Sequence, residues 1–193
     1  MITKDNFFGL IYHFLFAISS SVVGAIVASW PLLFIFMLVQ KTYETVHMSL
    51  FQVMHNYNQL MIYLIWPFKN RLKMDNFPTS ANAAEHFAEC KQLFVFAVLV
   101  FIVCLMLYFV FKKRRKKALL SLDKSAALIL LLLPIVVFPF AVTNFDSFFV
   151  IFHHMLFNNN DWLFDPNTDP IINVLTEGFF ASCFAVAGII YEL

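Results

Sequence analysis

The chain alternates long apolar stretches with shorter polar ones, and the apolar stretches are longer than the helices of an ordinary soluble domain. Three of them, residues 7–39, 94–111 and 126–145, contain no Asp, Glu, Lys or Arg. A helix that crosses a membrane needs roughly 20 mainly apolar residues, so these stretches predict three spans. The prolines in the first and third stretches fit this reading, because neighbouring helices can satisfy the carbonyls that a proline frees.

The last uncharged stretch, residues 178–191, is shorter than a membrane crossing requires. For a fourth span its helix must begin near Ile171 or Ile172. Such a start would draw Glu177 into the outer part of the membrane. An ionisable group at that depth is a candidate for function.

The connection between the first two spans predicts further helix. Residues 40–67 carry apolar side chains three or four positions apart, at Tyr43, Val46, Leu50, Met54, Tyr57, Met61 and Leu64. This spacing predicts an amphipathic helix, which beside an anchor would lie in the membrane interface. Asn82 and Glu85 have the spacing of a capping box, so we expect the helix of the second span to begin there.

The basic run at residues 112–117 orients these elements. In a soluble protein it could bind nucleic acid, but between two spans it is typical of a cytoplasmic loop. Both termini then lie in the cytoplasm, and the two other connections face outward. The net charge of +1 gives no reason to expect a nucleic-acid partner.

Composition agrees with the pattern, since 61% of the residues are hydrophobic and only 13% are charged. A soluble domain carries roughly a quarter charged residues. We therefore predict an all-α polytopic membrane protein with one domain, residues 1–193. Its parts are spans at about 9–39, 93–111, 126–145 and 172–191, extracytoplasmic segments 40–92 and 146–171, and a cytoplasmic loop 112–125. Its scattered cysteines (Cys90, Cys104 and Cys183) have neither metal-site nor disulfide spacing.

Candidate chemistry gathers in residues 151–180, which combine histidines and acids with many aromatics but contain no Lys or Arg. The topology places His153 and His154 on the same side of the membrane as His86, whose helix face also carries Glu89. Imidazole titrates near neutrality, so two of these side chains could share acid and base roles.

Two further sets of residues are ambiguous. Asp165 and Asp169, each followed by proline, are typical of turns. A non-enzymatic alternative is a metal-handling membrane protein that uses His47, Met48, Met54 and His55. No motif supplies a protein nucleophile beside a base, so the nucleophile of an enzyme would belong to its substrate or to water.

Short motifs between Tyr57 and Phe180 together resemble the lipoprotein intramolecular transacylase family, Lit, of Gram-positive bacteria. In chain order they are Tyr57-x-x-Leu60-Met61-x-Tyr63-Leu64-x-x-Pro67-Phe68, Phe77-Pro78-x-Ser80, His86-Phe87-x-Glu89-x-Lys91, Phe152-His153, Trp162-Leu163-Phe164-Asp165-Pro166-x-x-Asp169-Pro170 and Leu175-x-Glu177-x-Phe179-Phe180. Each motif is weak alone, and their ordered combination is specific.

The resemblance implies an enzyme that moves the sn-2 acyl chain of a diacylglyceryl-cysteine to the α-amine of the same cysteine. Its partners would be diacylated lipoproteins and membrane lipids, it would need no cofactor or metal, and we expect a monomer. The two histidines of the family match His86 and His153.

Our hypothesis makes His153 the general base for the substrate amine, while His86 stabilises the oxyanion or protonates the leaving glyceryl oxygen. Glu177 or an aspartate of the Asp-Pro turns would orient an imidazole. The further candidates for support or substrate binding are Asp165, Asp169, His154, Glu89 and Trp162. Because His154 adjoins His153, the sequence leaves open which ring faces the substrate.

Overall fold

The computed structural model describes residues 4–114 and 121–193. In these residues the chain is helical and contains no strand. The elements in chain order are α1 (Lys4–Gln40), α2 (Thr42–Thr45), α3 (Leu50–Ile65), α4 (Ala81–Lys113), α5 (Lys124–Thr143), α6 (Phe145–Leu156), a 3-10 helix (Pro170–Asn173) and α7 (Glu177–Glu192).

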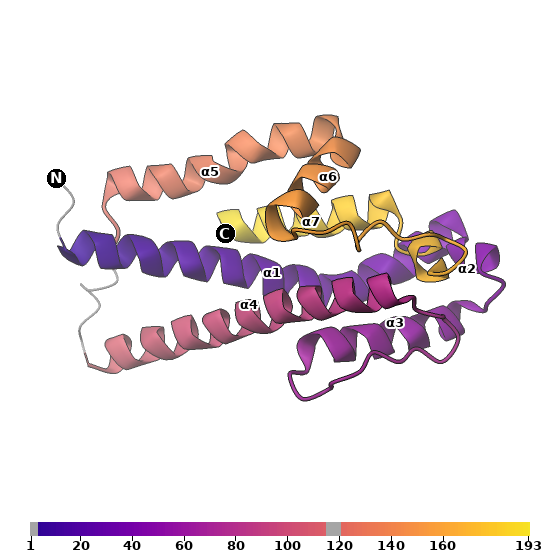
Figure 1. Ribbon diagram of the computed structural model, residues 1–193. Coiled ribbons are helices and arrows are strands. Elements are labelled where there is room, and N and C mark those ends of the chain that lie inside the picture. Colours follow the sequence, from indigo (N-terminus) through magenta and orange to yellow (C-terminus); the bar gives the residue numbers. More distant parts are fainter. Residues whose placement is uncertain (1–3, 115–120) are drawn as a thin grey trace.

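Helix α1 is the centre of the bundle, and α4 and α7 both pack along it although they lie far away in sequence (Figure 1). Two glycines allow a close approach of α1 and α7. A Cβ at Gly24 would collide with Ile190, and a Cβ at Gly178 would lie 2.8 Å from Phe36. Small residues at such positions are typical of helix pairs in membranes.

One end of the bundle is covered by α2, α3 and the irregular segment before α7 (Figure 1). We call residues 41–80 and 157–176 the cap. Here lies a continuous core of buried hydrophobic side chains: Ile26, Leu33, Met37, Val53, Tyr57, Leu60, Met61, Tyr63, Leu64, Met74, Phe77, Ala83, Phe87, Ile171, Val174, Leu175 and Phe179. The cap therefore holds the end of α1 and the start of α4 by ordinary apolar packing.

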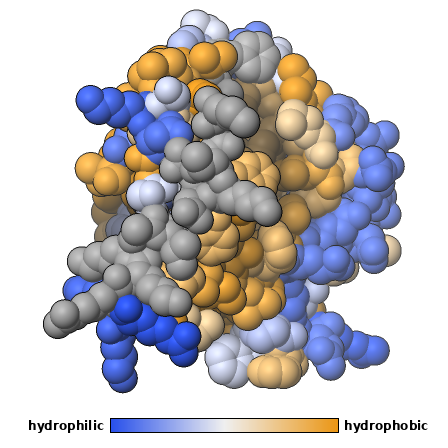
Figure 2. All heavy atoms as spheres, turned by 90° about the vertical axis from the view of Figure 1, so that its left-hand side faces the viewer, coloured by the Kyte–Doolittle hydropathy of each residue, from blue (hydrophilic) through white to orange (hydrophobic). Residues whose placement is uncertain are grey.

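Away from the cap, apolar side chains face outward. Two helical stretches are long and apolar enough to cross a membrane, Phe7–Gln40 and Ala81–Lys113, and only 6% of the most apolar window of the second is buried. Figure 2, which views the bundle from the end where α1 begins, shows hydrophobic side chains gathered on that face. Apolar exposure on this scale fits a lipid environment.

The prediction of an all-helical protein with membrane-length helices is confirmed. The number of four spans and the in-plane placement of the helix between the first two spans stay predictions. Of the basic run, Lys112, Lys113 and Arg114 end α4, whereas residues 115–117 lie outside the described residues.

The predicted continuous helix over residues 40–67 is wrong in its first part. Helix α2 is a single turn that ends at Thr45, and His47 adopts a positive φ of 54°, which interrupts the helix. Helix α3 then begins after Ser49, whose hydroxyl accepts from the N–H of Gln52, while the Gln52 side chain accepts from the N–H of Ser49. This capping box supplies the start signal for α3.

The predicted start of the second long helix is also displaced. Ser80, rather than Asn82, caps α4, and its hydroxyl accepts from the N–H of Ala83 at 3.1 Å. Glu85 is exposed in the second turn. Asn82 and Glu85 thus have the spacing of a capping box but do not form one, because the helix has already begun at Ala81.

Helix α7 begins at Glu177 and not near Ile171 or Ile172 as predicted. The residues before it form a 3-10 turn instead, with Ile171 and Val174 buried in the cap core. Burial of these side chains fixes the backbone in a path that a continuous helix could not follow.

Candidate active site

Two histidines predicted to share a site lie side by side at the capped end. His86 comes from the second turn of α4 and His153 from α6. Their ring centroids are 5.6 Å apart, and only 7% and 8% of the two residues is exposed. Two imidazoles this close can act on one small reacting group.

A backbone hydrogen bond fixes the protonation of the His153 ring. Its Nδ1 lies 2.7 Å from the carbonyl oxygen of Phe149, one turn earlier in α6. A carbonyl only accepts, so Nδ1 carries the proton and Nε2 keeps its lone pair. The ring also packs against the rings of Phe149 at 4.0 Å and Trp162 at 4.8 Å. His153 is therefore held with a basic nitrogen free.

Burial keeps both imidazoles neutral. It lowers the pKa of His86 to about 4, and the neighbouring His153 adds to the effect. Burial also lowers the pKa of His153, against the opposing influence of its hydrogen bond to Phe149 and with a smaller contribution from His154. Near pH 7 the site therefore offers a base and a neutral N–H donor.

The His86 ring is surrounded by aromatic and polar neighbours. Phe157 and Phe164 approach it edge-on, with centroids at 4.7 and 5.7 Å. Its Nε2 lies 3.4 Å from the sulfur of Cys90, and its Nδ1 lies 4.0 Å from Glu89 Oε2. As the helical spacing predicted, Glu89 shares the face of α4 that carries His86, and Cys90 lies on that face too.

Asp169 connects the two halves of the site. Its carboxylate is buried and accepts the N–H of Ser80 at 2.6 Å and the hydroxyl of Thr168 at 2.8 Å. Ser80 is the residue that caps α4, so this bond ties the segment before α7 to the helix that carries His86. Asp169 positions the scaffold and does not touch an imidazole.

The other acidic candidates lie apart from the rings. Asp165 is exposed and accepts from the backbone and side chain of Asn167, as expected for a turn. Glu177 is exposed in the first turn of α7. The ring of His153 is thus oriented by a backbone carbonyl, and within residues 4–114 and 121–193 neither Glu177 nor the Asp-Pro aspartates hydrogen-bond to it.

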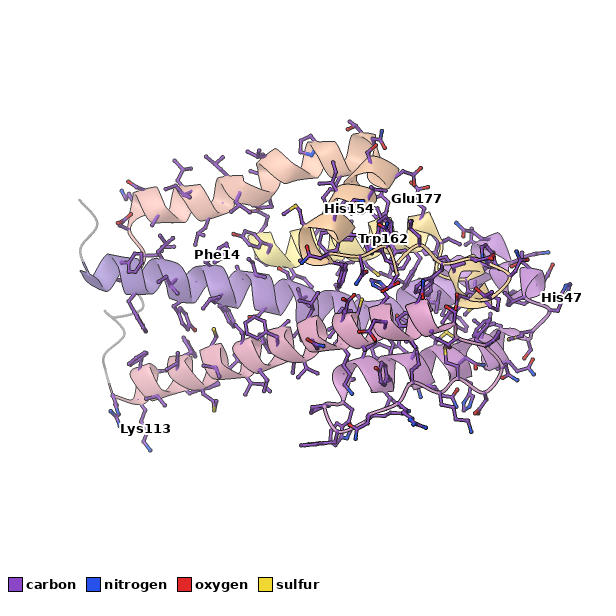
Figure 3. The ribbon with its side chains drawn as sticks, viewed as in Figure 1. Phe14, His47, Lys113, His154, Trp162 and Glu177 are labelled. Atoms are coloured by element: carbon purple, nitrogen blue, oxygen red, sulfur yellow. The ribbon has the colours of Figure 1, made fainter. Side chains whose placement is uncertain are left out.

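His154 and Trp162 lie on the α6 side of the site, and Glu177 stands at the start of α7 (Figure 3). His154 is exposed, and its ring meets the Trp162 ring edge-on at 5.4 Å. The burial of His153 beside His86 distinguishes the two adjacent histidines, a choice that the sequence left open.

Asn159 is a site residue that the sequence reasoning missed. Its side-chain amide donates to Glu89 Oε1 at 2.8 Å, and its backbone carbonyl accepts from the indole N–H of Trp162 at 3.1 Å. It therefore joins α4 to the aromatic wall of the other histidine. Nothing in the run of asparagines at 158–160 distinguishes this one, because the contact spans distant parts of the chain.

The two histidines of the metal-handling alternative lie outside the candidate site. His47 and His55 are exposed, and His55 Nε2 pairs with Asp75 at 3.1 Å. Among the described residues, no group of three or more His, Cys, Asp or Glu side chains is arranged to hold a metal ion.

The site has an imidazole base, a second neutral imidazole and aromatic walls. The Cys90 thiol lies 3.4 Å from His86 Nε2, but burial raises its pKa to about 12, so the thiol stays protonated near pH 7. Fold and site together define a helical membrane protein with a buried pair of imidazoles at one end of its bundle. The chain belongs to the lipoprotein intramolecular transacylase Lit family, whose family model matches residues 7–180.

Solved structures agree with this assignment. The structure of the membrane integral lipoprotein intramolecular transacylase Lit from Bacillus cereus superposes with a TM-score of 0.80 at 25% identity, over 97% of this chain and 89% of that chain. Two variants of that protein, with one histidine replaced by arginine or by alanine, each give a TM-score of 0.72 at 24% identity. They cover 97% of this chain and 85% and 87% of theirs, respectively.

No curated protein sequence matches the chain. The family match confirms the predicted class, an intramolecular transacylase, and the match to an integral membrane structure confirms the predicted membrane localisation. The metal-handling alternative is not favoured.

Proposed function

We propose that the chain moves the sn-2 acyl chain of a lipoprotein's N-terminal diacylglyceryl-cysteine to the α-amine of that cysteine, which gives a lyso-form lipoprotein. The observation that carries the proposal is the 5.6 Å separation of the His86 and His153 rings, because both can then act on one ester and one amine. Amine and ester belong to one molecule, so the site supplies proximity by folding the substrate.

The reaction needs no external reagent. The amine nitrogen attacks the sn-2 carbonyl carbon and forms a C–N bond, and the bond between that carbon and the glyceryl oxygen breaks. The amine loses one proton and the glyceryl oxygen gains one. Proton transfer is therefore the whole chemical task of the protein, and neither a cofactor nor a metal ion takes part in the proposal.

His153 is the proposed base. The hydrogen bond from its Nδ1 to Phe149 leaves Nε2 as the proton acceptor. An α-amine has a pKa near 8, so its deprotonation costs little near neutral pH. After attack, the same ring can return the proton to the glyceryl oxygen.

His86 is the proposed electrophilic partner. With a pKa of about 4, its ring is neutral and donates an N–H without being an acid itself. Such a donor can stabilise the oxyanion of the tetrahedral intermediate, and removal of one donor of this kind costs about 10²–10³ in rate. It can alternatively direct the proton to the leaving glyceryl oxygen.

The proposed topology has spans near residues 9–39, 93–111, 126–145 and 177–191, with both termini in the cytoplasm. The cap and the two histidines then face the extracytoplasmic side, where lipoproteins and outer-leaflet lipids meet them. Helix α7 begins only at Glu177, so the fourth span is short and the 3-10 turn lies at its outer end. We propose that the protein acts as a monomer.

A labelled substrate tests the reaction. A synthetic diacylglyceryl-cysteine peptide with an isotope label only in its sn-2 acyl chain is incubated with the protein in lipid nanodiscs. Mass spectrometry is expected to find the label on the α-amine. Label that stays on glycerol, or N-acylation by unlabelled membrane lipid, contradicts the proposed transfer.

Thiol labelling tests the orientation. In a chain whose native cysteines are replaced by alanine, a membrane-impermeant thiol reagent added to intact cells should label Phe68→Cys, at an 80% exposed position of the cap. It should not label Arg114→Cys, at the end of α4. The reverse pattern overturns the orientation.

A further inference from the structure

A gap between two polar atoms adjoins the histidine pair. His86 Nδ1 and Glu89 Oε2 are both buried, and neither has a hydrogen-bond partner among the residues that the structure describes. They lie 4.0 Å apart, too far for a direct hydrogen bond. The His86 side chain is 8% exposed. Buried polar atoms nearly always have a partner, so this pair indicates a place for a polar group from outside the chain.

The geometry of the gap selects a small donor. Suppose that a bound atom lies about 2.8 Å from both His86 Nδ1 and Glu89 Oε2. The angle at this bound atom is then roughly 90°, which a tetrahedral nitrogen or oxygen can adopt. An ionised carboxylate only accepts hydrogen bonds, so the group must donate to Glu89. A cationic donor gives the stronger, charge-assisted bond.

The chain supplies no cation of its own to Glu89. No Lys or Arg nitrogen in the described ranges lies within ion-pair distance of this carboxylate. Lys91 is the nearest basic residue in sequence, and its ammonium donates to the carbonyl of Lys69 and lies 4.6 Å from the centre of the Tyr63 ring. The unmatched negative charge is therefore available to a ligand.

Asn159 holds the carboxylate in place. Its amide binds Glu89 Oε1 at 2.8 Å, which leaves Oε2 as the oxygen that faces His86. The carbonyl of Asn159 accepts from Trp162, whose ring packs on His153. One set of hydrogen bonds thus fixes Oε2 relative to both imidazoles.

We infer that Glu89 binds the α-ammonium group of the substrate's N-terminal cysteine in the gap beside His86. This inference rests on the proposed function, in which that amine is the nucleophile. Bound there, the ammonium donates one N–H to Glu89 Oε2, one to the unprotonated Nδ1 of His86 and one towards His153, so that His86 carries its own proton on Nε2, the nitrogen that serves the oxyanion in the proposed function. Transfer of one proton to His153 Nε2, which passes it on to water, leaves the neutral amine in place to attack the ester. The second proton, which the nitrogen loses on attack, is the one that reaches the glyceryl oxygen.

The test compares two lipopeptides that differ only at the amine, one free and one N-acetylated. Binding of fluorescent versions is measured in phosphatidylcholine nanodiscs with the His153→Ala chain, whose turnover should be at least about 10²-fold slower than that of the wild type. The free amine should bind about tenfold more tightly, which corresponds to roughly 1.4 kcal/mol. Adding Glu89→Gln should abolish this preference.

Glu85→Gln is the matched control, because Glu85 lies one turn earlier on α4 and is exposed. It should keep the tenfold preference. Retention of the preference in Glu89→Gln overturns the inference. Should Glu89→Gln fail to fold, Asn159→Ala replaces it: releasing Oε1 should at least halve the preference, and an unchanged preference overturns the inference.

Phosphatidylethanolamine also carries an ammonium group, so the measurement is repeated in nanodiscs that contain it. An unchanged preference for the free-amine peptide supports the lipopeptide as the ligand, whereas loss of the preference in the chain with intact Glu89 assigns the gap to the headgroup and overturns the inference. Failure of the proposed function is distinguishable, because the isotope label then stays on glycerol in the wild-type chain whatever Glu89 binds.

Discussion

The two ends of helix α4 differ both in composition and in surroundings. Near its start, Ala83 and Phe87 are buried in the cap core beside His86. Further along, Phe96 and Phe109 are 64% and 60% exposed. The first end is stabilised by packing within the protein, and the second is stable only where lipid covers it.

The difference explains where the site lies. His86 is about two turns from the apolar stretch that begins at Leu93, so the imidazole pair stands where protein core gives way to lipid-facing helix. A substrate with fatty chains and a peptide amine needs both environments. The cap buries the two imidazoles, and under the proposed function the exposed apolar helices would face the acyl chains of the substrate.

The largest predicted effect concerns the capped end. His86→Ala and His153→Ala should each lower the rate of lyso-form production by about 10²–10⁴-fold, because each removes a proton-transfer or oxyanion group. His154→Ala, at an exposed position, should stay near wild-type activity. Mass spectrometry of lipoprotein N-terminal peptides measures all three. Unchanged N-acylation in both buried-histidine variants would falsify the proposed site.

The lipid-facing end gives the next largest effect. Ile102→Asp places a charge on an exposed apolar face of α4 and should disfavour membrane insertion by about 3–4 kcal/mol. Phe51→Asp, on the exposed side of α3 in the cap, should insert normally. The amount of each variant in the membrane fraction after alkaline extraction is the measurement. Equal amounts would mean that the two regions do not differ as described.

A smaller effect is expected at the joint within the cap. Asp169→Ala leaves the N–H of Ser80 without its carboxylate partner and should lower stability by about 1–3 kcal/mol. Asp165→Ala removes an exposed turn contact and should cost about 0.5 kcal/mol or less. Thermal unfolding in one detergent ranks the two variants. An equal loss would contradict the joining role of Asp169.

The smallest effect is a pH dependence of stability. The folded-state pKa of His86, about 4, lies below its ordinary value of 6.5, so the unfolded chain binds a proton first. Stability should therefore fall as the pH falls from about 6.5 towards 4. His86→Phe, which cannot titrate, should lose less thermal stability between pH 7 and pH 5 than wild type or His154→Phe does. Parallel losses in all three chains would rule out this contribution.

The pattern of hydrophobic residues predicted the helices well where the length of an apolar stretch alone decides the structure. The long uncharged stretches correctly predicted α1, the apolar part of α4 and α5. A long apolar stretch in a membrane is favourable only as a helix, because the helix satisfies its own backbone hydrogen bonds. The boundaries near polar residues were less successful. Ser80 and not Asn82 caps α4, and α7 starts at Glu177, because these ends depend on contacts made by the cap.

The sequence by itself determined the membrane class, the apolar helices and the identity of the candidate histidines through the family motifs. It also placed Glu89 on the face of His86, since helical spacing is a local property. Only the tertiary structure decided that His153 rather than His154 adjoins His86, that Phe149 sets its tautomer and that Asn159 fixes Glu89. Those contacts join α4 to α6 and to the segment before α7, which lie far from α4 in sequence. The positions of these elements depend on the packing of the cap, and the local sequence pattern does not encode that packing.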